Sequence, residues 1–294
     1  MSRNTLTFAF LFFFFPAVRN AYAQFNELLP VRFSLFTENY PLLNPALINM
    51  EDPRSLNTGT QITAGGFDRV YSFYLNGAFT LFPAQKPNQR LGVSFMGDWE
   101  GELISRSWFQ LMYSIEVPLS SKVKIGTGAH IGLMNYLVKS TNVSAGGSDL
   151  APLLSVGLKI RDDRGHFGIA FNQANRATVT PIEQPIRLNR HINLTATYEF
   201  QVSRMFVITP AVWFRWLESD FREYTFSVEG LLDDVFVFQA VWLYERNLTF
   251  GVGVKNTRLG RVNLALKFSY TVPFGEEVFD QFNLYEAHVG IKDF

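Results

Sequence analysis

The feature that most constrains the fold is a strictly alternating stretch, Gly260–Pro273, near the carboxyl terminus. Every second residue in it is apolar: Val262, Leu264, Leu266, Phe268, Tyr270 and Val272. The residues between them are small or polar and include Lys267. A period of two places the two sets on opposite faces of a β-strand. Such a strand fits a soluble sandwich, with its apolar face in the core, or a membrane barrel, with that face toward lipid.

Similar alternating stretches recur along most of the chain, between turn residues. Clear examples are Ser105–Val117, Leu150–Arg161 and Asn189–Val202. Soluble strands are usually about five or six residues long, whereas a tilted membrane strand needs about 9–11. The repeated stretches are of the longer kind. We therefore predict an all-β fold, a transmembrane antiparallel β-barrel of about 14 strands, in the outer membrane.

Charged residues within the predicted strands support the barrel. They share the parity of the polar faces: Lys124, Lys159, Glu199, Glu223, Glu229, Lys255 and Lys267. A Lys or Arg facing lipid at the bilayer midplane would cost about 2–4 kcal/mol. We therefore expect these charges to face the lumen.

The composition agrees with this location and excludes other classes. Aromatic residues make up 16% of the chain, which suits a lipid-facing wall with aromatic girdles. A formal net charge of +0 gives no sign of nucleic-acid binding. The absence of cysteine excludes disulfides and thiolate metal sites, and no two of the four histidines have metal-ligand spacing. We expect neither a metal nor a cofactor. We also expect outer-membrane lipid to surround the wall.

The chain begins with a predicted secretory signal peptide, residues 1–23. A short basic start precedes an apolar core, Leu6–Val18, and the cleavage pattern Ala21-Tyr22-Ala23. Residues 24–54 contain four prolines, which disfavour central strands. We expect this irregular segment to be a possible plug, packed in or under the barrel at its periplasmic side. Residues 55–294 then form the barrel, and the terminal Phe294 resembles an outer-membrane insertion signal.

Signs of catalysis are weak. Asp98 and Glu100 close one predicted strand and could form a carboxylate pair, but we interpret them as solvated charges at the rim. His130 is expected in the lumen as a hydrogen-bonded structural residue. The glycines of Gly251–Gly253 lie inside a strand, which indicates packing or curvature. We predict no enzyme, and an outer-membrane lipid hydrolase is the least favoured alternative.

Barrel physics does not explain one segment, Tyr40-Pro41-Leu42-Leu43-Asn44-Pro45-Ala46. It resembles the N-terminal Y-x-x-x-N-P-A motif of the PorP/SprF family, outer-membrane proteins of the Bacteroidetes type IX secretion and gliding machinery. Chain length, strand count and a last strand entered through Tyr285-Glu286-Ala287-His288 agree with that family. Leu47-Ile48-Asn49 departs from the Tyr and Gly usual after the motif.

The resemblance implies a barrel that does no chemistry. Its partners would be other secretion or gliding components and a secreted, adhesin-type protein, exported or held at the surface through its C-terminal domain. The resemblance also makes Tyr40, Pro41, Asn44, Pro45 and Ala46 candidate binding residues. A channel or porin for small solutes is the alternative, because the predicted lumen is charged.

Overall fold

The computed structural model describes residues 27–28, 31–48, 52–64, 70–82, 88–142, 145–218, 222–243, 247–273 and 283–292. The predicted signal peptide and Phe294 lie outside these ranges. No helix within them is both long and apolar enough to cross a membrane.

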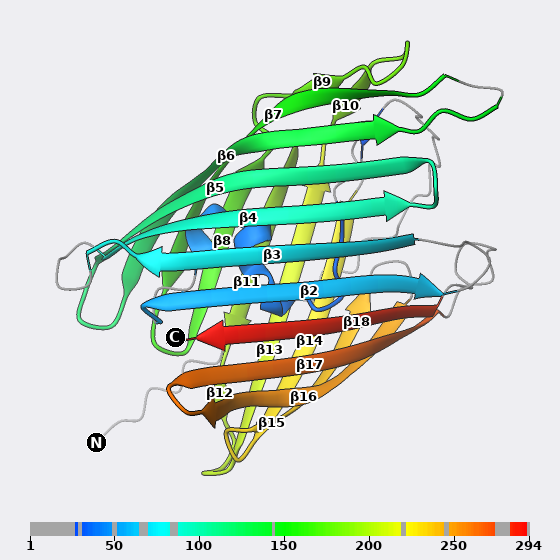
Figure 1. The fold of residues 1–294 in the computed structure, drawn as a ribbon. Helices are drawn as coiled ribbons and strands as arrows, with labels where there is room; N and C mark the ends of the chain where they lie inside the picture. Colours follow the sequence, from blue (N-terminus) through cyan, green and yellow to red (C-terminus); the bar gives the residue numbers. More distant parts are fainter. Residues whose placement is uncertain are drawn as a thin grey trace.

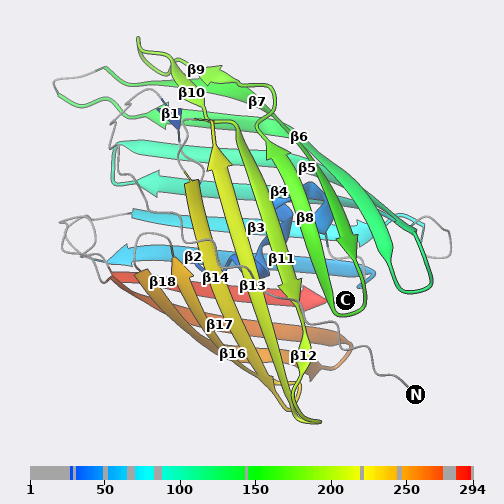
Figure 2. The same ribbon diagram turned by 180° about the vertical axis from the view of Figure 1, so that it is seen from behind.

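Fourteen antiparallel strands of the described chain form a closed barrel (Figures 1 and 2). They are β2 (Arg54–Ala64), β3 (Val70–Thr80), β4 (Asn88–Glu100), β5 (Ile104–Pro118), β6 (Lys124–Val138), β7 (Gly147–Arg161), β8 (Gly165–Asn172), β11 (His191–Tyr198), β13 (Phe206–Leu217), β14 (Arg222–Leu232), β15 (Phe236–Leu243), β16 (Asn247–Leu259), β17 (Val262–Pro273) and β18 (Asn283–Lys292). Consecutive wall strands pair with each other, and β18 pairs with β2 to close the wall. A short strand, β12 (Phe200–Gln201), also pairs with β13. The predicted fold class and strand number are confirmed.

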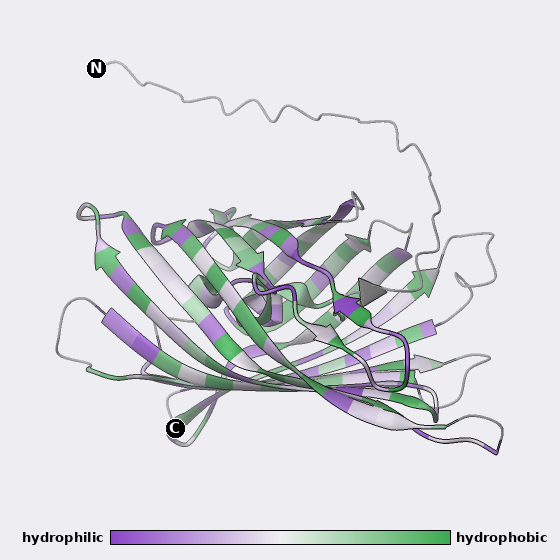
Figure 3. Cartoon of the chain, turned by 90° about the horizontal axis from the view of Figure 1, so that it is seen from above, coloured by the Kyte–Doolittle hydropathy of each residue, from purple (hydrophilic) through white to green (hydrophobic). Residues whose placement is uncertain are grey.

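The alternation of each strand sorts side chains between lipid and lumen. In β17, Phe268 is 58% exposed, whereas its neighbour Lys267 is 1% exposed. Figure 3 shows hydrophobic and hydrophilic residues alternating along the strands. The stretch that allowed a sandwich or a barrel thus turns its apolar face outward, because the closed wall leaves only the lumen for its polar face.

The two ends of the barrel differ. At the terminus end, where β2 begins and β18 finishes, β7 and β8 are joined by residues 162–164 and β14 and β15 by residues 233–235. The opposite, loop end carries the longest connections in sequence, which link β6 to β7, β8 to β11 and β17 to β18. The connection 173–190 contains β9 (Thr178–Val179) and β10 (Ile186–Leu188). These pair with each other, and β10 pairs with β1 (Glu27–Leu28), to make a small sheet.

The interior is filled at two places. At the loop end, apolar side chains of β5–β7 pack against the 173–190 connection in a cluster that includes Trp108, Met134 and Leu188. Deeper in the barrel, Phe36 and Leu43 of the N-terminal segment pack against Trp213 on β13 and Val241 on β15. The described part of this segment contains η1 (Phe36–Glu38), α1 (Tyr40–Leu43) and η2 (Pro45–Leu47) and lies within the ring of strands (Figure 1).

Candidate functional site: the bound luminal segment

Residues 31–48, here called the luminal segment, are built from short helical turns. Pro41 and Pro45 stand at early positions of α1 and η2, where a helix has no use for the missing N–H. Asn44 lies between these turns and caps η2, because its side-chain oxygen accepts a hydrogen bond from the Ala46 N–H at 2.9 Å. The motif therefore specifies a compact local structure that needs no partner strand.

Asn44 also fastens the segment to the wall. Its side chain is completely buried, and Nδ2 donates to the backbone oxygens of Leu158 on β7, at 3.1 Å, and Ile169 on β8, at 3.2 Å. Pro45 and Ala46 are buried beside it. One amide thus joins η2 to two adjacent strands of the barrel.

Inward-facing glycines make room for this contact. A Cβ at Gly157 would lie 2.0 Å from Asn44 Oδ1, and a Cβ at Gly168 would lie 2.7 Å from Asn44 Nδ2. At Gly128 on β6, a Cβ would lie 2.3 Å from the Pro45 oxygen. Real Cβ atoms do not approach other atoms this closely. The three glycines therefore form a recess in the wall that matches the Asn-Pro pair.

The end of α1 is held by the next strands of the wall. Asn172 on β8 and Asn193 on β11 both donate through Nδ2 to the Leu43 oxygen, at 3.1 and 2.9 Å. Tyr40 packs edge-on against His166, with ring centroids 4.7 Å apart. Burial raises the pKa of Tyr40 well above its usual range, so this ring stays neutral. The motif residues are thus brought together on one side of the lumen.

Ion pairs hold the segment to the opposite side. Glu38 binds Lys267 on β17, and Lys267 also binds Glu229 on β14. Lys255 on β16 lies 3.5 Å from Glu229 through Nζ and Oε1. Burial alone would raise the pKa of Glu38, but Lys267, His288 and Lys255 outweigh this and hold it well below its ordinary value. Glu38 is therefore ionised within a cluster that spans three strands.

Two further contacts continue this attachment toward the loop end. The Glu286 carboxylate on β18 accepts hydrogen bonds from the backbone N–H groups of Ser34, at 2.5 Å, and Leu35, at 2.8 Å. Arg32 lies 3.5 Å from Glu223 on β14, which also binds Arg215 at 2.8 Å. The segment therefore extends from the loop end into the lumen, because its partners are distributed along the inner wall. Its packing at the periplasmic side stays a prediction.

The other charges expected in the lumen lie elsewhere. Lys159 on β7 is 4% exposed and binds Glu116 at 2.9 Å, apart from the Glu38 cluster. Lys124 is half-buried at the start of β6. Glu199 is exposed between β11 and β12, because β11 ends at Tyr198. The structure thus gathers Glu223, Glu229, Lys255 and Lys267 around the luminal segment and leaves the remaining three outside that group.

The carboxylates considered for catalysis bind an arginine. Arg106 binds both Asp98 and Glu100, and Asp98 accepts a further hydrogen bond from Ser72 Oγ at 2.5 Å. The interpretation as solvated rim charges is wrong for Asp98, which is 5% exposed, because its position in β4 faces inward onto Arg106. Across the part of the chain that the structure describes, no group of three potential metal ligands is present.

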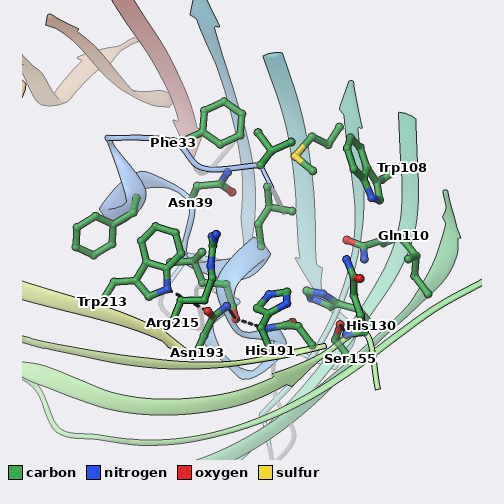
Figure 4. Close-up of a pocket in the computed structure, with 18 residues that line it drawn as sticks. Phe33, Asn39, Trp108, Gln110, His130, Ser155, His191, Asn193, Trp213 and Arg215 are labelled. Atoms are coloured by element: carbon green, nitrogen blue, oxygen red, sulfur yellow. Dashed lines mark hydrogen bonds between the residues drawn. The ribbon is translucent and has the colours of Figure 1, made fainter. Parts of the chain in front are cut away.

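A cavity of about 80 Å³ remains between the luminal segment and the wall (Figure 4). Trp108 on β5 and Trp213 on β13 lie on opposite sides of it, and Phe33 closes it from the luminal segment. His130 and His191 line its floor. His130 is 1% exposed, and its Nε2 contacts no hydrogen-bond partner among the described residues, unlike the expected structural histidine.

Sequence reasoning missed the recess and the amides that bind Leu43. Gly126, Gly128 and Gly132 alternate on the inward face of β6, and side chains that small cannot fill a lumen. That pattern indicates that another part of the chain occupies the space. The partners of Glu38 and Asn44 carry no comparable signal, because they lie more than 100 positions away in the sequence.

Comparisons with known proteins fit this geometry. The family model of the type IX secretion system membrane protein PorP/SprF matches residues 26–289, which include the luminal segment and nearly all of the wall. No match to a curated protein was found.

Several solved structures have a similar fold. The CymD monoaromatic hydrocarbon channel aligns with a TM-score of 0.53 and 13% identity, over 87% of this chain and 93% of that one. The Ralstonia pickettii toluene transporter TbuX gives 0.54 and 10%, over 87% and 94%. A Pseudomonas aeruginosa FadL homologue gives 0.52 and 9%, over 85% and 93%. At such low identities the likeness shows the fold alone, that of an outer-membrane barrel.

Proposed function

Because the chain belongs to the PorP/SprF family of type IX secretion system membrane proteins, we propose that it helps to export a secreted, adhesin-type partner or to anchor it at the cell surface. The protein is an outer-membrane β-barrel of this secretion system. Its role would be to bind the partner's C-terminal domain, together with other secretion or gliding components, without carrying out a chemical reaction.

The observation that carries the proposal is the bound luminal segment. It is attached to β7 and β8 through Asn44, to β17 through Glu38 and to β18 through its backbone. An open pore for solutes would need that space, whereas a binding platform gains rigidity from filling it. The presence of the segment in the lumen therefore favours a partner-binding role over conduction.

The loop end supplies the surface for such a partner. Outer-membrane barrels have short periplasmic turns and longer outer loops, which assigns the loop end to the cell exterior. The described parts of these loops include the 173–190 connection, which packs on the apolar cluster around Trp108. A firmly held outer surface suits the retention of another protein.

Deletion of the gene tests the proposal. Surface display of one large secreted protein should be lost, and native membranes should yield that protein bound to the tagged barrel. A deletion strain with normal display of its secreted proteins would contradict the role. Complementation of the deletion strain with a Gly251→Ala variant is the control. It should restore display, because a Cβ at this position would make only ordinary contacts.

The alternative function is a channel for small solutes. The structural neighbours named as a channel and as a transporter, and the remaining cavity, favour it. Purified protein in a planar bilayer would then conduct without any change to the luminal segment. A silent wild-type barrel that conducts only after Glu38 and Asn44 are both replaced by alanine would support the plugged, partner-binding form.

A further inference from the structure

Along part of β7, the side that faces β8 lacks a neighbouring barrel strand, although the other side stays paired with β6. The pairing of β7 with β8 runs from Arg161 only as far as Val156, opposite Phe171, although β7 continues to Gly147. β8 ends at Asn172, and the chain then enters the 173–190 connection. Figures 1 and 2 both place β9 beside this end of β7. We call the edge of β7 over residues 147–155, with the chain 174–180 that covers it, the β7 seam.

The β7 seam lies in the apolar band of the wall. The outward residues Leu150 and Leu154 are 61% and 37% exposed, and they continue the row formed by Val156 and Leu158. Unpaired backbone groups are not tolerated where a wall faces hydrocarbon. An edge at this place must therefore have its polar groups satisfied in some other way.

Residues 174–180 supply hydrogen-bond partners for the backbone groups of this edge. Pro152 has no N–H to leave unpaired, and its oxygen accepts from Asn175 Nδ2 at 2.6 Å. The Leu154 oxygen accepts from the Ala174 N–H at 2.8 Å. Asp149 accepts from the backbone of both Leu150, at 2.8 Å, and Thr180, at 2.6 Å. The seam is thus closed by a connection and not by a strand ladder.

The cavity lies directly behind the seam. Leu153 and Ser155 of β7 line it, together with Asn172 and Gln173, where β8 ends. These residues stand on the two sides of the point at which the β7–β8 pairing stops. Movement of residues 174–180 would therefore connect the cavity with the bilayer, without breaking a barrel strand.

The lining indicates what the cavity can hold. Its apolar wall includes Trp108 and Phe33. Its lining also carries His130 Nε2 and Gln173 Oε1, two buried polar atoms that contact no partner among the described residues. Arg215, the lining residue with a formal charge, is already bound to Glu223. The volume of about 80 Å³ is well below the ~150 Å³ of a cavity that binds benzene. The lining suits an apolar group with a neutral hydrogen-bonding head, and the size limits the ligand to a molecule smaller than benzene.

We propose that this cavity is a binding site for a short, uncharged, unbranched amphipathic molecule that is smaller than benzene and enters from the membrane through the β7 seam. The head of the molecule hydrogen-bonds to His130, and its short apolar part lies between Trp108 and Trp213. This inference does not depend on the secretion partner, so either proposal can fail alone.

Fluorescence quenching tests the binding site. The full chain, with Trp99, Trp216 and Trp242 replaced by phenylalanine, keeps Trp108 and Trp213 as reporters in phosphatidylcholine vesicles. The probe 2-bromoethanol should quench them saturably. Bromoacetate should bind at least tenfold more weakly, because the cavity offers no uncompensated positive charge. Saturation by neither probe, or tighter binding of the carboxylate, would overturn the proposal.

Two variants separate recognition from folding. His130→Phe keeps the ring size and removes the hydrogen bond, so the affinity for 2-bromoethanol should fall about tenfold. Ser269→Ala removes another buried luminal group without a partner among the described residues, away from the cavity, and should leave the affinity unchanged. The heat-dependent shift of folded barrels on gels verifies that both variants are folded. Equal affinities in the two folded variants would contradict a role for His130.

The entry route has its own test. The chain has no cysteine, so Pro152→Cys with Asn175→Cys gives a unique pair that a short bismaleimide can join across the seam. Joining them should slow association of the membrane-dissolved alcohol at least tenfold, whereas the same pair treated with N-ethylmaleimide should not. An unchanged association rate after joining would refute lateral entry.

Discussion

Replacement of Gly157 by alanine should release the luminal segment. The new Cβ would lie 2.0 Å from Asn44 Oδ1, so the Asn44 side chain must leave its recess. It would lose its hydrogen bonds to Ala46, Leu158 and Ile169. At about 1 kcal/mol each, these bonds amount to roughly 3 kcal/mol. The displaced population of the segment should therefore rise by roughly a hundredfold.

Limited proteolysis with chymotrypsin measures that population. Its sites in the segment, such as Phe33 and Phe36, are buried in the wild-type barrel. When opening is fast compared with cleavage, the rate of cutting follows the population of the open form. Cutting within the segment should therefore accelerate by roughly a hundredfold in Gly157→Ala, while the wall stays resistant.

Gly251→Ala is the matched control. Gly251 also faces the lumen beside the segment, but a Cβ there would lie 3.4 Å from Gln239 and 3.6 Å from Leu35, which is ordinary contact. Its cutting rate should stay within a few-fold of wild type. If both variants are cut at the wild-type rate, or at the same raised rate, the recess does not hold the segment and the reasoning fails.

Three further changes probe the charges and the wall. Lys267→Met leaves the carboxylates of Glu38 and Glu229 without their shared partner and should lower the free energy of unfolding in urea by about 3–5 kcal/mol. Lys255→Met, at a more exposed pair, should cost less than about 1 kcal/mol. The lowered pKa of Glu38 means that its ionised form stabilises the fold fully when the pH is above the ordinary pKa of 4.5, and progressively less when the pH is below it. Glu38→Gln should therefore flatten the loss of thermal stability between pH 5 and roughly pH 3. Leu158→Lys, on the lipid face, should reduce stability by about 2–4 kcal/mol, and an unchanged urea midpoint would contradict the assigned orientation.

The wall was predictable from the sequence because its rule is local. Each strand has to satisfy lipid on one face and the lumen on the other, so a period of two records the orientation of Phe268 and Lys267 without knowledge of their neighbours. Strand lengths then distinguish a membrane barrel from a sandwich. Parity also turns Asp98 inward, but it does not reveal that Arg106 stands opposite it, so Asp98 was misread as a solvated rim charge.

The site depended on contacts that no local rule records. Tyr40–Ala46 was recognisable as a motif, and its two prolines set its shape, but its purpose became visible only against Gly128, Gly157 and Gly168 on three different strands. The β7 seam likewise depends on which residues of β8 pair with β7, a register that the alternation leaves open. Local periodicity therefore determined that the chain is a barrel. Only tertiary structure decided what fills it, because ion pairs and steric recesses join residues whose separation in sequence carries no signal.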